Sequence, residues 1–211
     1  MDTLIDVPFY GNLILCVLQD SPFPHPERAQ RLLLGTVAQE SNFRHTRQLG
    51  GGPARGLMQM EPFTERSVWH DYLATRPHLV AYITSRCGQR GPNAYALEYN
   101  MAYGILLMRT LYFWRDKATM PEVDDIEEAA RRYKRYYNTP GGKGTEREYI
   151  ANYQQYIQPY YHTPPSTEVL YASHIDPFDP TARTRRTRQP SHTREQRKQR
   201  PRGQRAAPPS P

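Results

Sequence analysis

The chain has 211 residues, of which 37% are apolar and 23% are charged, a balance that supports one folded domain of ordinary size. Two cysteines, Cys16 and Cys87, are too few for a disulfide framework, and their apolar neighbours predict reduced thiols in the core. The longest apolar run, Leu13 to Leu18, is far too short to span a bilayer. Asp2 and Asp6 stand where a secretory signal would carry positive charge, so we expect a soluble protein without a signal peptide.

The positive charge is concentrated near the C-terminus. The whole chain has a net charge of +7, whereas residues 181–211 hold ten Lys or Arg and one acidic residue, a net of +9. With five prolines and no aromatic residue, this segment cannot build a core, and we expect a disordered tail. Such a tail could contact DNA phosphates without sequence preference, or serve only for solubility. We expect a domain over 1–162 and a linker over 163–180 with an apolar stretch that could dock on a partner.

Helical periodicity runs through the first 160 residues, and no stretch shows the sustained alternation of a strand. We expect helices over 9–20, 26–43, from Pro62 onward and over 77–86, with prolines at three of the starts. Asn93 is a candidate cap for one long, buried helix that continues to about Arg115. Further helices are expected from Pro121 and from Thr145 to about Ile157. The sequence thus predicts an all-α domain.

Glu40 is the first candidate functional residue. It continues the apolar face formed by Leu33 and Val37 at helical spacing, so its carboxyl should be partly buried. Burial beside Val37 and Phe43 would raise its pKa and keep a proton available near neutral pH, as a general acid requires. A helix-end glutamate that simply faces water is the alternative.

A glycine-rich loop follows this helix. Gly50, Gly51 and Gly52 cannot continue the helix, and Gly56 allows positive φ or a close backbone approach just before Gln59. The amide of Gln59 offers a donor and an acceptor for a sugar. The sequence contains no nucleotide-binding glycine motif and no His–Cys metal spacing, so we expect neither a cofactor nor a metal.

These residues resemble a known family. Gln39-Glu40-Ser41, followed by Gly56-Leu57-Met58-Gln59, is similar to the signature of the soluble lytic transglycosylases, which are lysozyme-like. Two later segments match the family in the same order, namely Asn100 to Gly104 and Tyr137-Asn138 before Pro140-Gly141-Gly142. The resemblance covers roughly residues 26–157. The sequence of the motifs is most similar to the transglycosylase-like virion proteins of tailed phages. The chain departs from the family at Thr139-Pro140 and at Glu61, which puts its sugar specificity in question.

The resemblance implies an activity and a set of roles. A lytic transglycosylase cleaves the MurNAc–GlcNAc β-1,4 bond of peptidoglycan and leaves a 1,6-anhydro product. Glu40 would be the single catalytic acid and base, and Ser41 would orient it. The sugar cleft would be lined by Met58, Gln59, Tyr137 and Asn138. Asn100 would either face the cleft or serve as a hydrogen-bonded amide of the core.

Two other functions are compatible with the sequence. A hydrolysing lysozyme would need a second carboxylate, for which Glu61 and Glu65 are the candidates by proximity in the sequence. A virion protein that keeps the fold without turnover could use the tail to hold DNA or other virion proteins. The resemblance itself implies an enzyme carried in the virion that acts on peptidoglycan during infection.

Overall fold

The structure, a computed structural model, describes residues 5–117 and 119–161. Within these ranges the secondary structure is helical, and the only β-type pairings are isolated bridges that join Arg55 to Arg47 and to Met60. The all-α prediction is therefore confirmed. The expected linker and basic tail lie outside the described residues. In the part of the chain that is described, no helix combines the length and the apolar character that a bilayer span needs.

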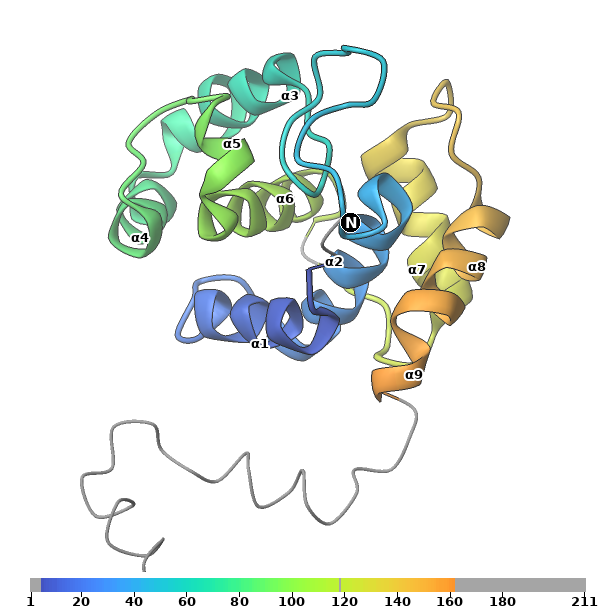
Figure 1. The fold of residues 1–211 in the computed structure, drawn as a ribbon. Coiled ribbons are helices and arrows are strands. Elements are labelled where there is room, and N and C mark those ends of the chain that lie inside the picture. Colours follow the sequence, from blue (N-terminus) through green and yellow to red (C-terminus); the bar gives the residue numbers. More distant parts are fainter. Residues whose placement is uncertain (1–4, 118, 162–211) are drawn as a thin grey trace, which may run out of the picture. The chain divides into compact units, whose positions relative to one another are not determined.

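Figure 1 shows the helices in chain order. The α-helices are α1 (Val7–Leu18), α2 (Pro26–Ser41), α3 (Pro62–Ser67), α4 (Pro77–Cys87), α5 (Ala96–Tyr99), α6 (Met101–Arg115), α7 (Ile126–Arg132), α8 (Glu146–Tyr156) and α9 (Gln158–Tyr161). Two segments are wound as π-helix, η1 (Val68–Tyr72) and η3 (Tyr133–Asn138), and η2 (Leu73–Thr75) is a 3₁₀ turn.

Local chemistry explains most helix starts. Pro26, Pro62 and Pro77 each occupy the first turn of a helix, where a missing N–H costs no hydrogen bond. A capping box is present at α8, where the Thr145 hydroxyl accepts from the Glu148 N–H and the Glu148 carboxylate accepts from the Thr145 N–H at 2.8 Å. These starts agree with the sequence prediction.

Two helix predictions are wrong. The expected long helix from Asn93 to Arg115 is interrupted at Asn100, whose backbone (φ −102°, ψ 88°) is not helical and whose side chain caps α6 by accepting from the Tyr103 N–H. The helix expected from Pro121 begins only at Ile126, after Asp125, which is its N-cap. In both places an Asn or Asp side chain competes for backbone N–H groups and sets the boundary.

The expectation of two core thiols is wrong for Cys16, which is exposed. It lies on the side of α1 opposite the buried residues Tyr10 and Ile14. Cys87 is partly buried, and its thiol donates to the Ile83 carbonyl oxygen at 3.1 Å. Both cysteines are free.

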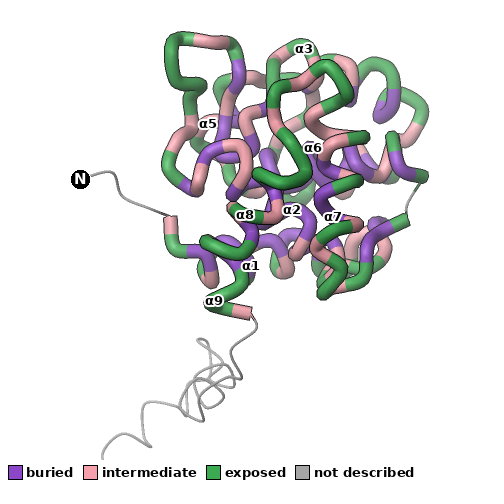
Figure 2. Tube along the Cα trace, turned by 90° about the vertical axis from the view of Figure 1, so that its right-hand side faces the viewer, coloured by how far each residue is buried: buried purple, intermediate pink, exposed green. Residues whose placement is uncertain are grey.

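The core is built around α2 and α6. Helix α2 packs against α1, α6 and α8, whereas α6 also contacts α4, α5, η1 and η3. Nearly every residue from Leu32 to Ala38 and from Tyr103 to Tyr112 is buried, which Figure 2 shows as buried stretches inside a more exposed outer layer. Two helices buried on most faces provide a rigid base for the residues at their ends.

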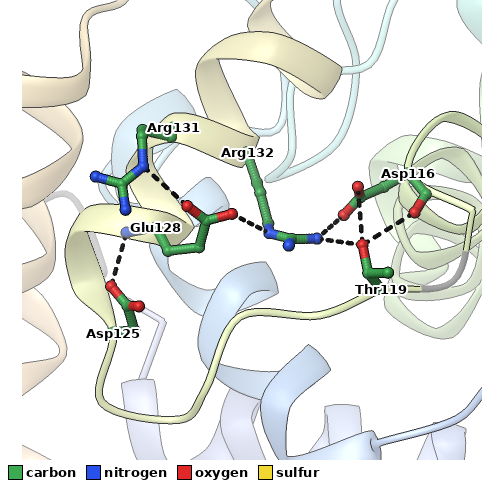
Figure 3. Close-up of polar contacts among 6 residues, drawn as sticks. All are labelled: Asp116, Thr119, Asp125, Glu128, Arg131 and Arg132. Atoms are coloured by element: carbon green, nitrogen blue, oxygen red, sulfur yellow. Dashed lines mark hydrogen bonds and ion pairs between the residues drawn. The ribbon is translucent and has the colours of Figure 1, made fainter.

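A polar network joins the end of α6 to α7 (Figure 3). The Arg132 guanidinium pairs with Asp116, donates to the Thr119 hydroxyl at 2.7 Å and pairs with Glu128 at 2.8 Å. Arg132 and Asp116 are both largely buried, so this pairing keeps two charges from being left uncompensated. Since Tyr133 follows Arg132 directly, the network also fixes the start of η3.

Gly56 is the tightest point of the loop before α3. Its φ is +73°, and a Cβ atom there would lie 2.4 Å from the Leu97 carbonyl oxygen and 2.5 Å from the Met58 sulfur. Gly51 also has a positive φ, +80°, but a Cβ atom there would meet nothing within 4 Å. Both glycines relieve backbone strain, and only Gly56 also permits close packing.

We therefore expect Gly56→Ala to destabilise the domain more than Gly51→Ala. Alanine at either position loses about 1–2 kcal/mol from the left-handed backbone. At position 56 it must also displace a backbone carbonyl, which adds roughly 1–3 kcal/mol of overpacking. Urea unfolding followed by circular dichroism measures the loss of stability in each variant. Equal losses for the two variants would show that the close approach at Gly56 has no energetic weight.

Candidate active site

Glu40 lies in the last turn of α2, which ends at Ser41. The following residue, Asn42, adopts the left-handed conformation that closes the helix, and its N–H donates to the Ala38 carbonyl oxygen at 3.1 Å. Glu40 is partly buried, and its Oε1 accepts from the Tyr133 hydroxyl at 2.8 Å. The carboxyl thus sits where a rigid helix ends and an irregular loop begins.

Burial controls the protonation of this carboxyl. Burial raises the pKa of Glu40 from 4.5 to about 7, while the hydrogen bond from Tyr133 acts in the opposite direction and only partly offsets it. Near neutral pH the group is therefore present in both protonation states, as required of a residue that first gives a proton and later accepts one. The sequence-based expectation of a raised pKa is confirmed.

Glu40 opens into a cleft of about 620 Å³. One wall is formed by residues within 45–64, including His45, Gln59 and Glu61. The facing lining comes from the last turns of α6, through Leu111 and Arg115, and from residues within 137–143. The cleft is large enough for a sugar unit with its substituents.

Gln59 is held rigidly in this lining. Its backbone has a φ of +47°, and its side-chain amide donates to the carbonyl oxygens of Gly56 at 2.8 Å and His45 at 3.2 Å. Both bonds use the amide nitrogen. The amide oxygen has no protein donor among the described residues, and it can accept from a ligand in the cleft.

Tyr137 and Asn138 order the opposite side. The Tyr137 hydroxyl donates to the Met58 carbonyl oxygen at 2.8 Å, and its ring stacks on Tyr112 and Tyr133 at centroid distances of 5.6 and 6.2 Å. The side-chain oxygen of Asn138 accepts from Lys134 Nζ at 2.9 Å.

Lys134 also holds the loop that follows η3. Its Nζ donates to the carbonyl oxygens of Gly142 at 2.8 Å and Gly144 at 2.9 Å. The ammonium thereby closes residues 139–144 into a compact loop, part of which lines the cleft.

Three of the predicted site residues lie elsewhere. Ser41 is buried, and its hydroxyl donates to the Val37 carbonyl oxygen at 3.3 Å rather than to the Glu40 carboxyl. The Met58 side chain is in the core, and only its backbone carbonyl meets Tyr137. Asn100 caps α6 and donates to the Cys87 carbonyl oxygen at 3.0 Å. The cleft therefore collects Glu40, Gln59, Tyr137 and Asn138 but not these three.

Tyr133 is the site residue that sequence reasoning missed. Its ring is buried, and its hydroxyl is the hydrogen-bond donor to Glu40. Tyr133 and Tyr137 are four residues apart, so a shared helix face was visible in the sequence. The spacing does not identify the partner of either hydroxyl, because Glu40 lies 93 residues before Tyr133 in the sequence.

The two candidate second carboxylates occupy different environments. Glu61 is exposed and lines the cleft. Glu65 is fully buried outside the cleft, where its Oε1 accepts from the Tyr103 hydroxyl at 2.5 Å and from the Asn93 N–H at 2.6 Å. Glu65 thus serves to connect α3 to the segment before α5.

Among residues 5–117 and 119–161, no group of three or more His, Cys, Asp or Glu side chains is arranged to hold a metal ion. Comparison of the chain with protein-family models, with curated proteins and with solved structures found no match.

Glu40→Gln should change the pH dependence of stability. The pKa of Glu40 in the folded protein, about 7, lies above the ordinary glutamate pKa of 4.5 that applies to the unfolded chain. The folded protein therefore holds the proton more tightly, and its free energy of unfolding falls as the pH rises from 4.5 to 7. Glutamine does not titrate, so the variant should match the parent near pH 4 and exceed it by about 1–3 kcal/mol above pH 7. Urea unfolding across this range measures the difference. Glu61→Gln, which removes an exposed carboxyl from the same cleft, is the control.

Tyr133→Phe should raise the pKa of Glu40 further. The change removes the hydroxyl that favours the ionised carboxylate but keeps the stacked ring. Titration of the labelled Glu40 side chain by NMR measures the pKa directly. Tyr153→Phe is the matched control, because Tyr153 belongs to the same run of stacked rings and its buried hydroxyl has no partner among the residues that the structure describes. An unchanged or lower pKa in Tyr133→Phe would mean that Tyr133 does not control the acid.

Proposed function

We propose that this protein is a lytic transglycosylase with a lysozyme-like fold, which cleaves the MurNAc–GlcNAc β-1,4 bond of peptidoglycan. The observation that carries the proposal is the buried Glu40 carboxyl, with a pKa raised to about 7, at the edge of a cleft with polar walls. General acids that protonate a glycosidic oxygen have this environment. The resemblance of Glu40-Ser41 and of Gly56 to Gln59 to the family signature points to the same reaction.

In the proposed reaction one carboxyl acts twice. Protonated Glu40 donates its proton to the glycosidic oxygen as the bond to C1 of the muramoyl sugar breaks, and the substrate's own acetamido oxygen stabilises the developing positive charge. The Glu40 carboxylate then takes the proton from the C6 hydroxyl, whose oxygen bonds to C1. The products are a 1,6-anhydro sugar and a free GlcNAc end, and Glu40 is again protonated.

The surroundings of Glu40 support this single-carboxylate scheme. Tyr133 contributes one donor to Oε1, so the carboxyl keeps a fixed orientation in both protonation states. Gln59 and Asn138 provide amides in the cleft, suited to the acetamido and hydroxyl groups of the sugar.

A hydrolysing lysozyme is the closest alternative. It would need a second carboxylate to activate water or to form a covalent intermediate. Glu61 is the only one of the two earlier candidates that lines the cleft, and its exposure gives it an ordinary surface environment. The anhydro product is favoured because Glu40-Ser41 and Gly56 to Gln59 resemble the transglycosylase signature.

The first test is a comparison of the parent protein with Glu40→Gln on purified sacculi. We expect the parent to release anhydro-muropeptides and the variant to lose activity by about 100-fold or more, since a general acid contributes roughly this factor. Mass spectrometry of the digest reads the product. Reducing ends in place of anhydro ends would assign a hydrolase, and equal lysis by Glu40→Gln would remove Glu40 from the mechanism.

We propose that the enzyme is carried in the virion and opens the cell wall locally during infection. This follows from the similarity of the motifs to phage transglycosylase-like proteins. Zymography of purified particles that carry this protein tests it. A folded protein without lytic activity in any form would instead favour a structural virion protein, which would contact DNA through residues 181–211.

A further inference from the structure

Arg115 lines the cleft, and it has no ion-pair partner within residues 5–117 and 119–161. It lies at the end of α6, and its Nη1 donates to the Tyr136 carbonyl oxygen at 2.7 Å. Ion pairs among the described residues use Arg28, Arg47, Arg55, Arg131 and Arg132, but not Arg115. The guanidinium is thus oriented by one backbone bond and has donors to spare.

Arg115 as a residue is exposed, and part of its side chain is packed against the lining of the cleft. Burial lowers the pKa of Arg115, and Tyr137 acts in the opposite direction. A guanidinium nevertheless remains charged at any physiological pH. Because no carboxylate of the described residues pairs with Arg115, an anionic ligand in the cleft would gain a strong, charge-assisted hydrogen bond with it.

A second cation belongs to the same wall. Lys143 is exposed and lines the cleft, and no carboxylate pairs with it within the described ranges. Arg115 is bonded to η3 through Tyr136, and Lys143 lies in the loop that follows η3. Glu61, just before α3, lines the same cleft, and among the described residues it forms no ion pair with either cation.

We propose that Arg115, assisted by Lys143, binds a carboxylate carried by the glycan, so that the cleft selects anionic muramoyl strands over neutral N-acetylglucosamine polymers. The inference rests on the proposed function, because it names a feature of the substrate that the same cleft would accept. The carboxylate could belong to the lactyl group of a peptide-free muramoyl sugar or to the stem peptide attached to it. The planar guanidinium fork suits either source.

Binding to the full chain in the Glu40→Gln background tests this without turnover. Calorimetric titrations would use three ligands: a neutral chitotetraose, a peptide-free muramoyl tetrasaccharide and the same tetrasaccharide with stem peptides. We expect Arg115→Gln to weaken both muramoyl ligands by about tenfold or more and to leave chitotetraose within about twofold. If only the peptide-bearing ligand weakens, the carboxylate is that of the stem peptide.

Three controls make the result decisive. Arg86→Gln removes an exposed arginine that also bonds a backbone carbonyl, that of Gln19, outside the cleft, and it should not change binding. Arg115→Lys should restore part of the affinity, because it keeps the charge without the fork. Raised salt should weaken muramoyl binding in the parent more than in Arg115→Gln.

Two outcomes overturn the inference. Equal loss for all three ligands would show that Arg115 only supports the cleft through Tyr136, and no loss for any ligand would show that it takes no part in binding. Either leaves the proposed function intact. If the Glu40→Gln protein with Arg115 in place binds none of the three, the proposed function fails first, and the inference fails with it.

Discussion

The site depends on the balance between burial of the Glu40 carboxyl and its hydrogen bond with Tyr133. Burial alone would make the group a permanently neutral acid, and strong hydrogen bonding alone would make it a permanently ionised base. Here burial outweighs one hydrogen bond, and the pKa reaches about 7. A proton can then leave and return near neutral pH, which is the property that a single residue acting as acid and base must have.

Helix packing holds this balance in place. Tyr133 stacks between Tyr137 and Tyr149 at centroid distances of 6.2 and 5.1 Å, so its ring cannot move away from Glu40 without disturbing two neighbours. The residue before it, Arg132, is fixed by its ion pairs to Asp116 and Glu128 (Figure 3). The π-helical winding of η3 occurs at this point, in keeping with the frequent occurrence of such turns at functional sites.

The cleft combines this acid with two different walls. The part of the lining that includes Gln59 is set by a tight turn, since Gly56 and Gln59 both have positive φ and a hydrogen bond joins them. The wall that includes Asn138 is set by an ammonium, because Lys134 gathers the loop carbonyls around its own charge. A ligand would meet neutral amides from both walls and positive charge from one, which suits a sugar polymer with acidic substituents.

The sequence by itself determined the helical class, the starts of α2, α3, α4 and α8, and the partly buried position of Glu40. These follow from local rules, since proline position, capping boxes and apolar spacing act within a few residues. It did not determine the break at Asn100, because the choice between continuing a helix and capping the next one is decided by the surrounding packing. It also did not determine that Ser41 and Met58 face the core.

Only the tertiary structure decided which groups meet. Tyr133 reaches Glu40 across 93 residues and Tyr137 reaches Met58 across 79, and no local pattern encodes such pairs. The same holds for Arg115, which in the sequence is an ordinary basic residue at a helix end. Only the fold brings it to the cleft, bonded to Tyr136 of η3 and without an ion-pair partner in the described part of the chain. Side-chain type and spacing are local properties, whereas burial, pKa and pairing depend on every element packed around a group.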